Sequence, residues 1–281
     1  MAGSLEMSRL AMTCAYAGIS GKQKLRELLN SGLDPNTRNE HDGKTLLCVC
    51  ARCGSTEVAG MLLEAGANIN IPDKYGETPL WAAAEQGQIE VVRMLLYRGA
   101  EINARNKYDQ TPVWAAADCG HTETVRLLLR DSRVHVNANS TFFGAPPVWI
   151  AAGNGKTDIV RILVVNGANI NARSKYGGTT PVSIAAGSGY TDIVRILVDK
   201  GADINCIDND GQTPVWRAAH HGSTEIVRIL VDKGAKINIP NNYGVTPISC
   251  AASRGNDDVV KLLGRPYDLR RSPRLVRKFP L

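Results

Sequence analysis

Two short motifs contain residue types that could bind phosphate or zinc. Gly155 to Thr157 resembles the end of a phosphate-binding GxxxxGK[ST] loop, but the first glycine of that loop would stand at position 150, which is Ile150. Cys50 and Cys53 have the spacing of a zinc-ligand pair, yet no second pair accompanies them, and a structural zinc site needs about four ligands. We therefore expect neither a nucleotide site nor a metal site here.

Two further motifs resemble metal-binding sites but do not meet the requirements of such sites. His220 and His221 are adjacent, so on a helix they point in different directions and fit a surface better than a ligand pair. Asp208 to Gly211 resembles a calcium loop but lacks the acidic residue that such a loop needs later. No Ser/His/Asp or Cys/His set falls into one pocket from the pattern. We predict a non-catalytic protein without cofactor.

A repeat of about 33 residues carries all of these motifs. Its clearest mark is a proline, preceded by threonine in five of six copies, followed by an Ala-Ala pair and then by a glycine. Threonine can cap a helix and proline suits the first helical position, so each copy predicts a helix start, and the glycine predicts its end. The prolines are Pro79, Pro112, Pro147, Pro181, Pro214 and Pro247, with separations of 33, 35, 34, 33 and 33 residues.

A second helix follows in each copy, with apolar residues at helical spacing such as Ile89, Val92, Leu95 and Leu96. It ends at Gly-Ala, and the polar, turn-rich segment after it predicts a hairpin-like finger. Helices this short are marginal alone, since isolated helices need roughly 12–15 residues to persist in water. We therefore expect stability to come from stacking between neighbouring copies.

The pattern closely resembles the ankyrin repeat, which combines T-P-L-H, A-A, G-H, a second helix ending in L-L, and G-A-x-x-N. The resemblance implies an all-α repeat solenoid, a stack of helix-turn-helix units with β-hairpin-like fingers. It covers residues 9–264 in about eight repeats, of which the degenerate first and last are expected to act as caps. Their approximate bounds are 9–44, 45–77, 78–110, 111–145, 146–179, 180–212, 213–245 and 246–264. Irregular insertions should fall in loops.

Only an N-terminal lead of residues 1–8 and a basic tail of residues 265–281 lie outside these repeats, so no catalytic domain fits beside them. The net charge is +6, but the tail alone accounts for +5. A basic face along the body is therefore absent and nucleic acid is an unlikely partner. Seven cysteines without a framework spacing favour a cytoplasmic protein, with nuclear import through the tail as the alternative. No segment predicts a membrane span.

In similar proteins partners usually bind the concave face formed by fingers and first helices. Scaffold positions are fixed by packing, so the remaining positions are the candidate partner-binding site, and the fingers among them are rich in Tyr and Phe, which are common at interface hot spots. Either these aromatic residues bind a partner, or they pack on adjacent fingers and stiffen the edge. The candidates are Lys74, Tyr75, Glu77, Glu85, Gln86, Lys107, Tyr108, Gln110, Asp118, Phe142, Phe143, Asn154, Lys175, Tyr176, Ser188, His220, His221, Tyr243 and Arg254.

The main departure from the family is tryptophan where it usually has histidine, at Trp81, Trp114, Trp149 and Trp216. The first interpretation is that the indoles pack between repeats with a partner for their N–H, as buried tryptophan generally has. The second makes them part of an aromatic binding strip. In the tail, Ser272 is a candidate phosphorylation site, and the tail itself is a targeting segment, a cap or a solvated end.

The function expected from the resemblance is a protein-interaction scaffold or adaptor that is a monomer on its own and binds another protein. One alternative is an inhibitor or effector that occludes a partner enzyme through the same face. Another is a regulatory module whose basic tail docks on nucleic acid or an anionic membrane.

Overall fold

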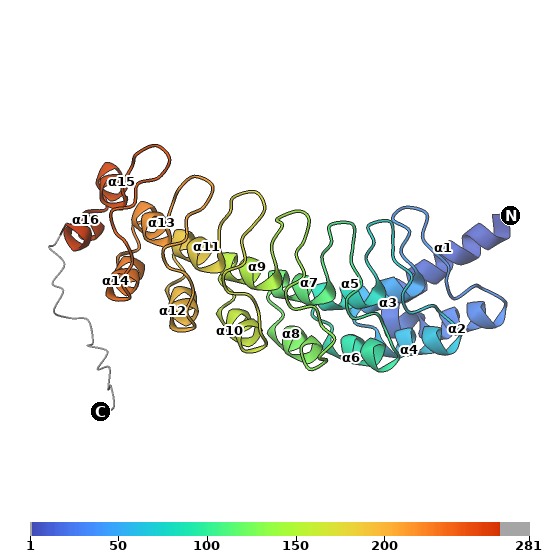
Figure 1. Cartoon of the computed structure of the whole chain (residues 1–281). Coiled ribbons are helices and arrows are strands. Elements are labelled where there is room, and N and C mark those ends of the chain that lie inside the picture. Colours follow the sequence, from blue (N-terminus) through green and yellow to red (C-terminus); the bar gives the residue numbers. More distant parts are fainter. Residues whose placement is uncertain (1, 265–281) are drawn as a thin grey trace, which may run out of the picture.

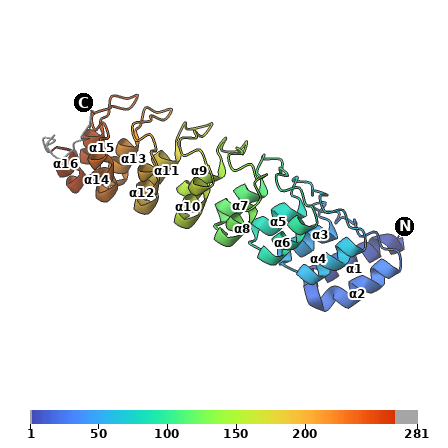
Figure 2. The same cartoon turned by 60° about the horizontal axis from the view of Figure 1, so that its bottom comes forward.

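The computed structural model describes residues 2–264, and within them the chain is a curved stack of short helices (Figure 1). Each repeat has an inner helix, an outer helix and a loop, the finger, that leads to the next inner helix. Figures 1 and 2 show the inner and outer helices as two rows, with the fingers projecting beside the inner row at the concave edge. No β-strand forms in these residues; the first finger holds an isolated antiparallel bridge between Arg38 and Thr45.

The inner helices of the regular repeats are α3 (Leu46–Cys53), α5 (Pro79–Glu85), α7 (Pro112–Cys119), α9 (Pro147–Gly153), α11 (Pro181–Ser188), α13 (Pro214–His221) and α15 (Pro247–Ser253). The outer helices are α4 (Thr56–Glu64), α6 (Ile89–Tyr97), α8 (Thr122–Leu128), α10 (Thr157–Val165), α12 (Thr191–Asp199), α14 (Thr224–Asp232) and α16 (Asp257–Leu263). The predicted repeat fold is confirmed.

Five inner helices, α5, α7, α11, α13 and α15, start at the proline of a Thr-Pro pair, as predicted. The hydroxyl of Thr78 accepts a hydrogen bond from the backbone N–H of Trp81, at 3.2 Å, and Pro79 occupies the first helical position. In α9 the capping threonine is replaced by Pro146, and no side chain caps that helix. α7 ends at Gly120, whose φ of +87° is a left-handed conformation that glycine adopts without strain.

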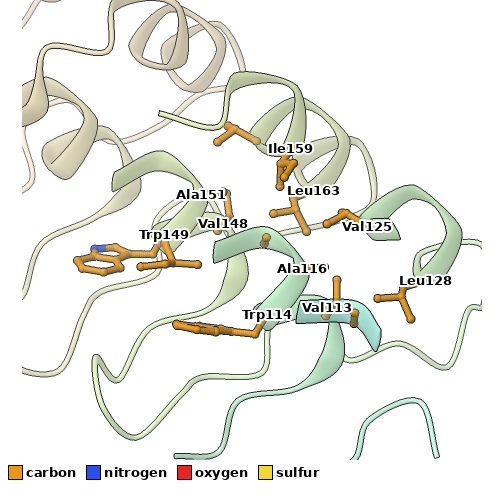
Figure 3. Close-up of a cluster of buried hydrophobic side chains, with 14 of the residues drawn as sticks. Val113, Trp114, Ala116, Val125, Leu128, Val148, Trp149, Ala151, Ile159 and Leu163 are labelled. Carbon is orange, nitrogen blue, oxygen red and sulfur yellow. The ribbon is translucent and has the colours of Figure 1, made fainter. Parts of the chain in front are cut away.

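The apolar core runs through the stack between the two rows of helices. In its centre the side chains of α7, α8, α9 and α10 interdigitate (Figure 3). Ala116 and Ala151 are fully buried on the inner helices, while Val125, Leu128 and Leu163 are fully buried on the outer ones. Because each helix has only two or three turns, this burial between repeats is what stabilises it.

The N-terminal lead is helical, which the sequence did not indicate. Helix α1 runs from Ala2 to Ala17, so the expected boundary at residue 9 falls inside a helix. A 3₁₀ turn, η1 (Gly18–Gly21), connects it to α2 (Lys22–Asn30). The turn packs so closely on α1 that a Cβ on Gly21 would lie 2.2 Å from the backbone oxygen of Cys14. The basic tail, including Ser272, lies outside the described residues.

The irregular insertions fall in loops. The longest connection joins α8 to α9 and includes the extra residue between Leu129 and Val136 and the insertion before Pro147. α8 ends at Leu128 and has seven residues, whereas α10 and α12 have nine. The repeat therefore absorbs length changes outside the packed helices.

Candidate functional site: finger tips and inner helices

The fingers are connected to one another by backbone hydrogen bonds at their tips. The N–H of Lys107 donates to the carbonyl of Tyr75 at 2.9 Å, and the N–H of Thr141 donates to the carbonyl of Tyr108 at 2.8 Å. The same bond recurs from Lys74 to Asp42, Lys175 to Phe143, Asn209 to Gly177 and Asn242 to Asp210. The tips therefore form one continuous, mutually supported edge.

Each tip is also closed internally by a polar side chain. Oδ1 of Asp73 accepts hydrogen bonds from the N–H groups of Tyr75 and Glu77, at 2.8 and 3.0 Å. Asn106 makes the corresponding pair of bonds to Tyr108 and Gln110. Such bonds replace backbone partners that a loop lacks, so they hold the tip in one conformation.

A second row of bonds lies at the base of the fingers, at an asparagine that in most repeats closes the G-A-x-x-N motif. The side-chain oxygen of Asn70 accepts from the N–H of Glu101 at 2.9 Å, and that of Asn103 accepts from the N–H of His135 at 2.8 Å. Asn36, Asn137, Asn171 and Asn205 make the same bond to the following repeat. The asparagine thus joins successive repeats.

The aromatic residues of the finger tips are exposed. The exposed fractions are 37% for Tyr75, 45% for Tyr108, 61% for Phe142, 68% for Tyr176 and 79% for Tyr243. Tyr108 and Phe142 touch edge to face, with ring centroids 6.3 Å apart, so neighbouring tips do contact each other. That contact leaves most of Phe142 and about half of Tyr108 open to solvent.

Phe143 differs from the other candidates, since it points into the stack. It is partly buried, and its ring lies 6.4 Å from that of Trp114 and 5.5 Å from that of Trp149. The fourth finger contains two consecutive aromatic residues, of which Phe142 is exposed and Phe143 is partly buried. Phe143 is therefore a packing residue between repeats.

Two of the candidate partner-binding residues, Glu77 and Glu85, form ion pairs within the protein. Arg52 of α3 contacts Glu77 of the next finger at 2.8 Å and Glu85 of α5 at 2.5 Å. All three side chains are about one-quarter exposed or less. A partner that binds here would contact all three side chains together, because both carboxylates are paired with the guanidinium of Arg52.

Burial beside Asp73 raises the pKa of Glu77 to about 7, despite the nearby Arg52. The folded state therefore holds this proton more tightly than the unfolded chain, whose glutamate has an ordinary value of 4.5. It follows that this group's contribution to stability is complete below pH 4.5 and is lost as the pH rises through about 7.

We expect Glu77→Gln to remove this component of the pH dependence, which for one proton is at most about 1.4 kcal/mol per pH unit. Urea unfolding followed by circular dichroism across that pH interval measures it. The exposed Glu64 on α4 supplies the control, because Glu64→Gln should leave the wild-type slope unchanged. An identical slope in wild type and Glu77→Gln would contradict the assignment.

The other candidates, on the inner helices and in the fingers, make separate small contacts or are exposed. Asn154 donates to the carboxylate of Asp118 at 2.8 Å, and the ring of His220 stacks on Trp216 with centroids 5.3 Å apart. Gln86 donates to Glu85, and Gln110 accepts from Asn106. Ser188 is half-buried at the end of α11, whereas Lys74, Lys107, Lys175, His221 and Arg254 are exposed.

The tryptophans are buried, as the packing interpretation expects, but only three of the four indoles have the expected partner for their N–H. Their exposed fractions are 5% for Trp81, 2% for Trp114, 9% for Trp149 and 7% for Trp216. The indole N–H groups of Trp114, Trp149 and Trp216 donate to carbonyls of the following finger, those of Ala145, Thr179 and Val245, at 2.9–3.2 Å. Trp81 Nε1 has no hydrogen-bond partner in the described part of the chain.

The motifs that resemble nucleotide and metal sites lie in repeat positions with a structural role. Gly155 and Lys156 lie in the turn between α9 and α10, and Thr157 is the first residue of α10. Burial raises the pKa of the Cys50 thiol to about 12, whereas Cys53 is exposed. No group of three His, Cys, Asp or Glu side chains suited to a metal ion occurs in the described residues, and none of their helices is long and apolar enough to cross a membrane.

This architecture defines a solenoid of helix-turn-helix repeats with hydrogen-bonded fingers. The family model for ankyrin repeats in three copies matches residues 11–106, 113–208 and 184–271, and the chain belongs to the ankyrin-repeat family. The crystal structure of the ankyrin repeat domain of Bcl-3, a unique member of the IκB protein family, is similar, with 24% identity and a TM-score of 0.68. The alignment covers 79% of this chain and 100% of that one. No curated protein sequence matches the chain.

Proposed function

We propose that this chain is a non-catalytic scaffold or adaptor that binds a partner protein through its finger tips and inner helices. Ankyrin repeats are in general protein-interaction modules. The observation that supports this surface is the row of exposed aromatic side chains on tips that are fixed by hydrogen bonds to one another.

Rigid aromatic side chains suit binding for two reasons. Each offers a large contact area with few rotors to immobilise, which lowers the entropy cost of association. The tip backbone is also held by Asp73, Asn106, Asp208 and Asn241, so the loops need little ordering when a partner arrives. A row of this kind fits a partner that lies across several repeats.

We expect the double variant Tyr108→Ala and Tyr176→Ala to weaken partner binding by at least about tenfold per tyrosine. Its melting temperature should stay within about 2 °C of wild type, because both side chains are largely exposed and the tip backbone bonds remain. Quantitative pull-down followed by titration of the recovered partner measures binding, and differential scanning calorimetry measures stability.

Tyr97→Ala is the matched control, since Tyr97 is 87% exposed on the outer helix α6. It should change neither binding nor melting temperature. The proposal would be wrong if the double variant lost much of its stability but still bound its partner as tightly as wild type. In that case the tyrosines would stiffen the edge of the stack and the partner would bind elsewhere.

A further inference from the structure

The central finger tips carry lysines that form no ion pair with a carboxylate in the part of the chain that the structure describes. We consider the four tips formed by residues 73–77, 106–110, 140–145 and 174–179. Their acidic residues are Asp73, Glu77 and Asp109, and each is engaged within the protein. Asp73 is 5% exposed and closes its own tip, Glu77 contacts Arg52, and Asp109 lies 3.7 Å from Arg105.

The basic residues of the same tips are Lys74, Lys107 and Lys175, and none has a carboxylate within 4.0 Å in the described residues. The ammonium group of Lys74 donates a hydrogen bond to the backbone carbonyl of His41 at 2.5 Å, and all three ammonium groups lie beside tyrosine rings. Lys74 and Lys107 are 5.2 and 4.8 Å from the ring centroid of Tyr75, and Lys175 is 5.4 Å from that of Tyr176. These contacts hold the cations at the surface and still leave them accessible to an anion.

We propose that the finger tips bind an acidic, extended segment of the partner protein that runs across successive fingers. This inference rests on the proposed function and specifies the chemistry of the partner. Carboxylates of such a segment would pair with Lys74, Lys107 and Lys175, while its side-chain stems would pack on the exposed rings between them. Charge complementarity of this kind chooses the partner and sets its register.

The arrangement favours a protein segment over nucleic acid. The lysine position of the tip is taken by Thr141 in the fourth finger and by Asn209 in the sixth, so the positive charge is interrupted. In the sixth finger the acidic Asp210 follows Asn209 directly. The inner helices add two further acidic residues, Glu85 and Asp118. A phosphate backbone is uniformly charged and needs a continuous basic track, whereas a peptide can place its carboxylates at separate points.

The test is selection of random linear peptides, displayed on phage, on the immobilised full chain. We expect the selected peptides to contain more Asp and Glu than the unselected library. A synthetic copy of the most enriched peptide should bind about tenfold more weakly to the double variant Lys107→Gln and Lys175→Gln, and its affinity for wild type should fall as salt rises. The control Lys200→Gln and Lys236→Gln removes the same charge from exposed positions off the tips and should leave the affinity unchanged.

Several results would overturn the inference. In the selection, these results are enrichment of neutral or basic peptides, or failure to enrich any peptide. In the affinity measurements, they are equal affinity of the peptide for wild type and for the double lysine variant, or competition between oligothymidine and the peptide. The Tyr108→Ala and Tyr176→Ala variant separates this failure from that of the proposed function. Neutral peptides that need these tyrosines would refute the acidic segment and keep the binding surface, whereas peptides indifferent to the tyrosines would refute the surface itself.

Discussion

Trp114→Ala is expected to lower the free energy of unfolding by about 3–5 kcal/mol. The indole is 2% exposed, lies stacked beside Phe143 at 6.4 Å between ring centroids, and donates its N–H to the carbonyl of Ala145 at 3.2 Å. Alanine would leave a cavity between the third regular inner helix, α7, and the finger that follows it. It would also remove the hydrogen bond that joins α7 to this finger.

Urea unfolding monitored by tryptophan fluorescence and circular dichroism measures this loss. Tyr97→Ala, which truncates an aromatic residue that is 87% exposed, should cost less than about 0.5 kcal/mol in the same assay. If the two variants were equally stable, Trp114 would not be a packing residue. That result would favour the alternative interpretation, in which the tryptophans belong to an aromatic binding strip.

Leu163→Ala is expected to cost about 2–5 kcal/mol. Leu163 is fully buried on α10 and lies in the central cluster with Val125, Val148 and Ile159 (Figure 3). The cluster combines residues of two successive repeats, 111–145 and 146–179, so the cavity would weaken the junction between the two halves of the stack. In a solenoid, stability depends on such nearest-neighbour junctions, and a weak central one also lowers cooperativity.

The denaturant dependence of unfolding should therefore become shallower in Leu163→Ala, because the halves unfold at different concentrations. Val165→Ala, two residues further along the same helix, is the control, since Val165 is 73% exposed. It should leave both the midpoint and the slope close to wild type. A midpoint for Leu163→Ala as high as that of Val165→Ala would show that the centre of the stack tolerates a cavity there.

The repeat architecture follows from sequence because its signals are local and recur in phase. Threonine, proline and glycine act within one turn of their own helix, as the cap on Trp81 N and the left-handed Gly120 show. The N-terminal helix lacks these signals. Residues 2–8 contain no proline and no capping pair in register, so the pattern alone does not indicate that this segment is helical.

The candidate site follows from sequence only in part. Arg52, Glu85 and Asp118 are 33 residues apart and hold the same position in successive repeats, so the period implies that they are neighbours. The pairing of Arg52 with Glu77 depends on side-chain rotamers and cannot be obtained from a period. Phe142 and Phe143 are adjacent in a finger with an inserted residue, and only three-dimensional packing decides which of them points inward.

At the tips and at the asparagines, each junction repeats the same set of bonds, in which a backbone N–H of one repeat donates to an oxygen of the repeat before it. The regular junctions therefore use equivalent donors and acceptors. If residues 180–212 were deleted, Asn171 would face the N–H of Lys236, and Gly177 would face that of Asn242, with the same donor and acceptor as before. A gene encoding this chain can therefore gain or lose whole repeats by duplication or deletion, and the breadth of the binding face can evolve separately from its chemistry.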